Sequence, residues 1–265
     1  MSSSVLLSVE SGVATLTLNR PRSSNAINKV MAERLRSVVH ELEAREDVRC
    51  IAINAAGSDF SCGIDLWELN LLSQSESASG LPLYVWHFIR EFLEAVHTFR
   101  RVNKPVVIAA HGMTSGAGIP LLLSADICIA LDDATFDLGC KSTGMPLIGM
   151  ASTELSKALG AHRLMDIAVS GERITASEMD SVGLIRALGP GADLEKELRS
   201  VVAEVLDNWD CGAAEIKSSR SRNFFSRSQS MFESDIKALS HYVGTSDFQV
   251  KLKAIMQARQ QALRA

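Results

Sequence analysis

The chain has 265 residues, of which 46% are apolar and 22% are charged, and its formal net charge is -4. This length and apolar content allow one sizeable buried core and argue against a disordered chain. The slightly acidic balance offers no extended positive field for a phosphate backbone, so nucleic acid is not an expected partner. The sequence contains neither an export-signal pattern nor an apolar stretch of about 20 residues, which excludes a membrane-spanning helix and favours the cytoplasm, with an organelle left open.

The five cysteines are widely separated and form no C-x-x-C pair. This odd number and irregular spacing favour free thiols in a reducing compartment. The six histidines stand in unrelated segments, and none belongs to a group with metal-ligand spacing. The sequence therefore predicts no metal site.

The first part of the chain alternates strands with a helix. Val5–Val9 and Val13–Asn19 show the period-two pattern of strands, with turn residues between them, so we expect a hairpin. From Asn28 the apolar residues follow helical spacing, and Cys50–Ala55 then predicts a buried strand. Strand, helix and strand in this order imply a crossover unit.

The same alternation returns further along the chain. Val85–Val102 has helical periodicity, and Val106–Ala110 and Ile127–Ala130 are compact strands rich in β-branched residues. From about Thr153 onward helical patterns dominate. Within that part, the Ser- and Arg-rich segment Ser218–Ser230 predicts either a mobile linker or a helical turn.

Two glycine-bearing loops, Gly57–Gly63 and Gly112–Gly118, each lead into a short predicted helix. Asp65 has the position of a helix N-cap, which leaves the N–H of Ile64 just outside the helix. The N–H of Ala117 is similarly unpaired at the second loop. Taken separately, each loop is most simply an ordinary loop-to-helix junction. If the loops meet in space, the two N–H groups form an oxyanion hole that could stabilise a thioester enolate.

Short motifs follow one another in order between Leu18 and Leu184. They are Leu18-Asn19-Arg20-Pro21, Asn25-Ala26-Ile27, Phe60–Leu66, Lys104-Pro105-Val106, His111-Gly112, Gly116-Ala117-Gly118, Ser124–Ile127, Ala134-Thr135-Phe136, Ser170–Ile174 and Gly183-Leu184. Each motif alone is degenerate. Their order and spacing together resemble the enoyl-CoA hydratase/isomerase (crotonase) family.

This resemblance implies an α/β fold of the crotonase type, a ββα spiral with two roughly perpendicular sheets and a C-terminal helical layer. Residues 1–200 would form the spiral core with the acyl-CoA site. Residues 201–265 would form a helical region that makes trimer contacts or acts as a lid. The resemblance also implies a homotrimer or hexamer and no tightly bound cofactor, because coenzyme A enters as part of the acyl-thioester substrate.

The resemblance also assigns residues to the site. The backbone N–H groups of Ile64 and Ala117 would form the oxyanion hole. The coenzyme A would lie against Ala26, Ile27, Cys62, Ile64 and Asp65.

The sequence departs from the family pattern at the two glutamates of the hydratases, whose positions here hold Pro120 and Cys140. Proline has no polar side-chain atom, and a thiol with a pKa of about 8.5 is a poor substitute for a carboxylic acid. An isomerase- or decarboxylase-like reaction is therefore a better expectation than ordinary hydration. Cys140 and Asp137 are candidate catalytic groups, although Cys140 more simply fills space as a small apolar residue. Tyr84 and His87, which share one helix face, are further candidates.

Two kinds of function remain open at this point. The chain could be an enzyme with unusual proton-transfer groups, or a catalytically degenerate acyl-CoA-binding scaffold or partner subunit that keeps the same loops. Turnover would separate them, because a scaffold would be stabilised by its ligand without converting it. An unrelated α/β binding domain would require the ordered motifs to be a coincidence.

Overall fold

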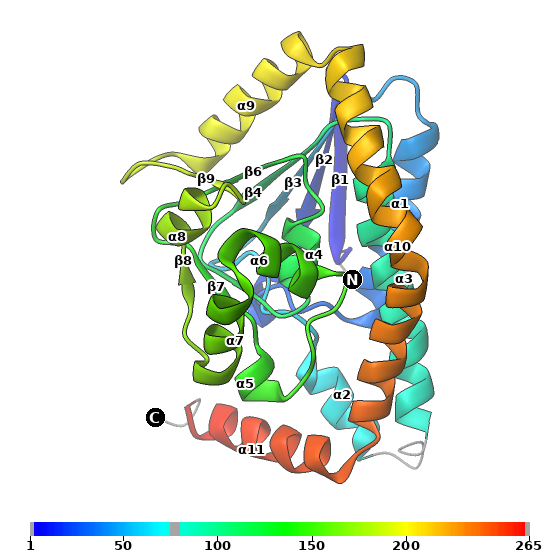
Figure 1. The fold of residues 1–265 in the computed structure, drawn as a ribbon, viewed down its shortest axis with the longest axis vertical. Helices are drawn as coiled ribbons and strands as arrows, with labels where there is room; N and C mark the ends of the chain where they lie inside the picture. Colours follow the sequence, from blue (N-terminus) through cyan, green and yellow to red (C-terminus); the bar gives the residue numbers. More distant parts are fainter. Residues whose placement is uncertain (1–2, 75–79, 263–265) are drawn as a thin grey trace.

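The computed structural model describes residues 3–74 and 80–262 of the protein. Its centre is a sheet with the strand order β1-β2-β3-β4-β6-β9 (Figure 1). All its neighbouring strands run parallel except β1 and β2. The strands are β1 (Val5–Glu10), β2 (Val13–Leu18), β3 (Cys50–Ala55), β4 (Val106–Ala110), β6 (Ile127–Ala130) and β9 (Arg186–Ala187).

The expected hairpin and crossover are both confirmed. β1 and β2 pair in antiparallel register, and the turn between them places Ser11 and Gly12 at positive φ. The helix α1 (Lys29–Ala44) then returns the chain so that β3 lies parallel to β2. The Asn28 side chain caps α1 by accepting a hydrogen bond from the Met31 N–H at 2.9 Å, which satisfies one of the unpaired donors of the first turn.

A second, smaller sheet has the order β5-β7-β8. Its strands are β5 (Met113–Ser115), β7 (Thr135–Asp137) and β8 (Ile174–Thr175). β5 and β7 are parallel, whereas β7 and β8 are antiparallel. The described residues thus form two sheets with helices around them, as the sequence predicts.

Helices cover the sheets and supply the walls of the site. A 3-10 turn, η1 (Pro21–Ser23), precedes α1. In chain order the remaining helices are α2 (Leu66–Ser73), α3 (Leu81–Arg101), α4 (Gly118–Leu122), α5 (Cys140–Thr143), α6 (Ala151–Leu159), α7 (Ala161–Ser170), α8 (Ala176–Ser181), α9 (Leu194–Asn208), α10 (Cys211–Val243) and α11 (Ser246–Ala262). None of the helices within the described ranges is long and apolar enough to cross a membrane.

The last three helices surround the core in different places (Figure 1). The apolar residues Val201, Val202 and Val205 of α9 pack with buried residues of β3, β4 and β6. The helix α9 is continuous across residues 200 and 201, between which the expected spiral core and the expected C-terminal region meet. α10 runs beside α3, and α11 then crosses near α2 and α5. The segment Ser218–Ser230 lies inside the continuous helix α10, so the linker alternative was wrong. This part of the chain is helical because α10 is stabilised by packing on α3.

Candidate functional site

The two glycine-bearing loops are brought together by backbone pairing. Ser61 donates its N–H to Met113 O at 3.2 Å, and Ser115 donates its N–H to Ser61 O at 2.8 Å. These bonds form a parallel bridge between Ser61 and Thr114, so the first loop adds to the edge of β5. Residues more than 50 positions apart in sequence therefore share one short stretch of sheet.

The two loops also approach each other closely at Gly63, which has a φ of +84°. A Cβ atom at this position would lie 2.8 Å from Ser115 O and 3.2 Å from Ala117 N. Glycine permits both the positive φ and the close approach. The residue after Gly63 is Ile64, so the backbones of Ile64 and Ala117 lie beside each other.

Both predicted oxyanion donors are free of a protein acceptor in the part of the chain that the structure describes. No hydrogen bond is formed there by the N–H of Ile64 or of Ala117. Their neighbours are paired, since Asp65 N donates to Ile27 O at 3.0 Å and Gly116 N donates to Asp137 O at 3.0 Å. Unpaired N–H groups flanked by paired ones are available to an external acceptor.

Asp65 fixes the first loop and does not present a free carboxylate. Its Oδ1 accepts from the N–H groups of Trp67 at 3.1 Å and Glu68 at 3.2 Å, which caps α2 as the sequence predicts. Its Oδ2 lies 2.8 Å from the guanidinium of Arg20. Arg20 also donates to Ala26 O. The ion pair therefore joins the residues before α1 to the loop that carries Ile64.

The other residues assigned to coenzyme A differ in accessibility. Ile27 is fully buried, and its N–H donates to Gly63 O at 2.7 Å, so its side chain belongs to the core. Ala26 is 4% exposed. Cys62 is half-buried and its thiol points to Ser23 O at 3.4 Å. Of these three residues, only Cys62 lines the cavity described next.

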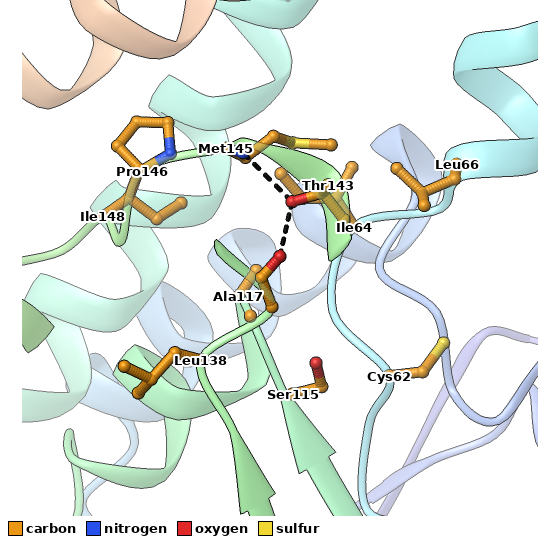
Figure 2. A pocket seen from close by; sticks show the side chains of 12 residues that line it. Cys62, Ile64, Leu66, Ser115, Ala117, Leu138, Thr143, Met145, Pro146 and Ile148 are labelled. Atoms are coloured by element: carbon orange, nitrogen blue, oxygen red, sulfur yellow. Dashed lines mark hydrogen bonds between the residues drawn. The ribbon is translucent and has the colours of Figure 1, made fainter. Parts of the chain in front are cut away.

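A cavity of about 50 Å³ opens where the two loops meet (Figure 2). This volume suits a thioester group and a few carbon atoms, because one water needs roughly 10–15 Å³ by the same measure. Most of the lining is apolar, and the polar side chains belong to Cys62, Ser115 and Thr143. The lining residues are Cys62, Ile64, Leu66, Ser115, Gly116, Ala117, Leu138, Gly139, Thr143, Met145, Pro146 and Ile148.

Asp137 and Cys140 are near the cavity in sequence, but neither side chain lines it. Asp137 Oδ1 accepts from the Gly139 N–H at 2.7 Å. The Cys140 thiol points to Leu138 O at 3.7 Å, and burial, followed by the charge of Asp137, raises the pKa of this thiol. The thiol is thus held in its neutral form and packs against the core.

Tyr84 and His87 line a different hollow of about 310 Å³, together with Lys29 and Leu72. Burial and the nearby carboxylate of Glu68 raise the pKa of Tyr84. The structure therefore does not bring these two side chains to the cavity at Ile64 and Ala117.

The wall formed by residues 143–150 is held in place by α10. Tyr242 donates its hydroxyl to Thr143 O at 3.1 Å. Asp235 Oδ2 accepts from the N–H groups of Gly149 at 2.8 Å and Met150 at 3.4 Å. These contacts have no local signal in the sequence because more than 80 residues separate the partners.

A comparison with protein families decides what kind of chain this is. The family model described as enoyl-CoA hydratase/isomerase matches residues 8–262. The chain belongs to this family.

One relative is the trans-2-decenoyl-[acyl-carrier-protein] isomerase of Streptococcus mutans, which is 27% identical over 96% of this chain and 95% of the relative. Another is the 1,2-epoxyphenylacetyl-CoA isomerase of Escherichia coli, which is 32% identical over 68% of each chain. An enoyl-CoA hydratase/isomerase structure from Mycobacterium paratuberculosis has a TM-score of 0.84 at 22% identity and covers 96% of this chain and 99% of that one. This similarity confirms the crotonase fold.

Proposed function

We propose that the protein binds an acyl-coenzyme A thioester and stabilises its enolate with the N–H groups of Ile64 and Ala117. The observation that supports this proposal is that Ile64 and Ala117 line one cavity and that their N–H groups have no acceptor within the described residues. The carbonyl oxygen of a thioester gains negative charge when the α-carbon loses a proton or carbon dioxide. Fixed donors aimed at that oxygen stabilise the transition state more than the ground state.

The cavity wall favours an isomerase- or decarboxylase-like reaction over hydration. Among the described residues, no aspartate, glutamate or histidine lines the cavity. Addition of water to an enoyl thioester is assisted by a pair of groups that position the water and transfer protons. Reactions that form and quench an enolate need fewer such groups. The names of the two curated relatives, both isomerases, support this choice.

The sharpest test removes one donor and leaves the backbone shape. Ala117 has a φ of -65°, which is the value that proline fixes, so Ala117→Pro removes the N–H without requiring a new φ. We expect turnover of the best thioester in an enoyl-, dienoyl- and malonyl-CoA panel to fall by about 100-fold or more. Ala117→Ser keeps the N–H and is the matched control. Undiminished turnover by Ala117→Pro would refute the oxyanion assignment.

A catalytically degenerate scaffold is the second candidate, and the lack of a carboxylate in the described cavity wall favours it. Such a protein would show a raised Tm with coenzyme A thioesters and no product by mass spectrometry. Turnover of any thioester in the panel would exclude this candidate. If no thioester raises the Tm or is converted, the ligand class itself is wrong.

We further propose a homotrimer or a hexamer, in keeping with the family resemblance. One supporting feature is the pair Met165 and Val169 on α7. These residues are 61% and 72% exposed and lie four positions apart, on the same face of the helix. Paired apolar side chains of this kind suit a subunit contact. Light scattering after gel filtration measures the mass directly, and a monomer would contradict the proposal.

A further inference from the structure

Ser115 places a hydroxyl group in the cavity wall beside the proposed oxyanion donors. It is the last residue of β5, and its side chain faces the same space as Ala117 and Thr143 (Figure 2). The residue is only 9% exposed. Its backbone N–H is already used in the bond to Ser61 O at 2.8 Å, which fixes the position from which the side chain projects.

The Ser115 hydroxyl has no hydrogen-bond partner in the described parts of the protein, unlike the other hydroxyl in the wall. Thr143 Oγ1 donates to Gly139 O at 2.7 Å and accepts from the Met145 N–H at 3.0 Å. Both bonds fix Thr143 in a structural role. The Ser115 oxygen does not belong to the fully buried unpaired side-chain atoms of the described residues, so it remains accessible from the cavity. The Ser115 hydroxyl can obtain a partner from whatever occupies the cavity.

The surroundings of Ser115 define the group that it can bind. A Cβ atom at Gly139 would lie 3.4 Å from Ser115 Oγ, so the glycine keeps space open in front of the hydroxyl. Leu138, Met145 and Ile148 provide apolar walls. No lysine or arginine lines the cavity within the described residues. A neutral oxygen needs no counter-charge there and would gain a hydrogen bond from the hydroxyl at little cost.

We propose that Ser115 is a specificity residue that selects acyl thioesters with a neutral oxygen, a hydroxyl or a carbonyl, on one of the first carbons beyond the thioester. This inference rests on the proposed function, because Ile64 and Ala117 must hold the thioester oxygen. Ser115 lies two residues before Ala117, and the cavity is about 50 Å³. Only the acyl carbons closest to the thioester can therefore reach the hydroxyl.

The test compares two ligands that differ by one oxygen. Calorimetry gives the Kd of 3-hydroxybutyryl-CoA and of butyryl-CoA for the wild-type protein, Ser115→Ala and Ser115→Cys. We expect the wild type to bind the hydroxylated thioester about threefold to tenfold more tightly, as one neutral hydrogen bond provides. Ser115→Ala should lose this preference, so that its Kd values for the two thioesters become equal. Ser115→Cys, with a similar shape and a weaker donor, should lose most of it.

The outcomes separate this inference from the proposal on which it rests. Equal binding of the two thioesters by the wild type overturns the role of Ser115 and leaves thioester binding in place. A preference that persists in Ser115→Ala overturns it as well, because another group must then recognise the oxygen. If neither thioester binds to the wild type, both proposals fail.

Discussion

Gly63 and Ala117 come so close that a Cβ atom on Gly63 would lie 3.2 Å from the backbone nitrogen of Ala117. This contact joins two loops that the sequence separates by more than 50 residues. It also determines where the Ile64 N–H lies relative to the Ala117 N–H. The proposed anion site therefore depends on the absence of a side chain at residue 63.

Gly63→Ala should disable the site. The new methyl group would lie 2.8 Å from Ser115 O, and the φ of +84° would strain any L side chain. The loops must separate, so we expect turnover to fall by about 100-fold, as when an oxyanion donor is lost. Gly189→Ala is the matched control, because nothing lies within 4 Å of its added methyl group. Equal turnover by the two variants would show that the loop contact is unimportant.

Cys140→Ala should keep most of the turnover. The thiol lies outside the cavity lining and points to Leu138 O at 3.7 Å, and burial raises its pKa. A neutral thiol held against a carbonyl is a weak nucleophile and a weak base. Loss of turnover without loss of Tm in this variant would return Cys140 to the mechanism.

Tyr242→Phe should weaken substrate binding through the cavity wall. The variant loses the hydrogen bond to Thr143 O, which is 3.1 Å long, so residues 143–150 become less firmly held. We expect KM to rise severalfold with a smaller change in kcat, and the free energy of unfolding to fall by about 1 kcal/mol. Tyr84→Phe changes a tyrosine that lines the other hollow and serves as the control. An unchanged KM in Tyr242→Phe would contradict the positioning role.

Lys217→Met should destabilise the protein by about 3 kcal/mol because it removes the nearer of the two cations beside the buried Asp126 carboxylate, Arg220 being 3.8 Å away. Lys217 is 5% exposed, and its ammonium group lies 2.5 Å from Asp126 Oδ2 and donates to the carbonyl oxygens of Phe99 and Lys104. Urea denaturation measures the loss. The double variant Lys217→Met/Asp126→Asn should recover part of it. No recovery would mean that Lys217 acts through its packing alone.

We expect the free energy of unfolding to fall at acidic pH because of the buried side chain of His97. Burial, assisted by the charges of Arg100 and Arg101, lowers the pKa of His97 from 6.5 to about 4. The unfolded chain therefore binds a proton between these two values while the folded protein does not. The stabilisation is complete above pH 6.5 and is lost as the pH falls toward 4.

The size of this effect follows from the pKa difference and amounts to about 3 kcal/mol between pH 7 and pH 4. The free energy of unfolding of His97→Leu should lack the part of the pH dependence that comes from the histidine. The ring of His97 lies 5.0 Å from that of Phe232, so an apolar replacement keeps the contact between α3 and α10. Unfolding curves at several pH values measure both slopes. Parallel slopes for the two proteins would exclude His97 as the group that titrates.

Much of the local structure could be predicted from short-range patterns. The alternation in β1 and β2, the capping position of Asp65 and the helical periodicity after Asn28 all identified real elements. These features depend on residues a few positions apart, and their physics is therefore visible in sequence. The segment Ser218–Ser230 was harder because the stability of α10 there comes from packing on α3.

The sequence by itself determined the family motifs, the two loops and the glycines that allow their backbones to turn. Only the tertiary structure decided that Ser61 pairs with β5 and that Ser115 lines the cavity whereas Asp137 and Cys140 do not. The physical reason is that the direction of a side chain at a loop depends on backbone hydrogen bonds and contacts with distant residues. Such partners leave no periodic pattern along the chain.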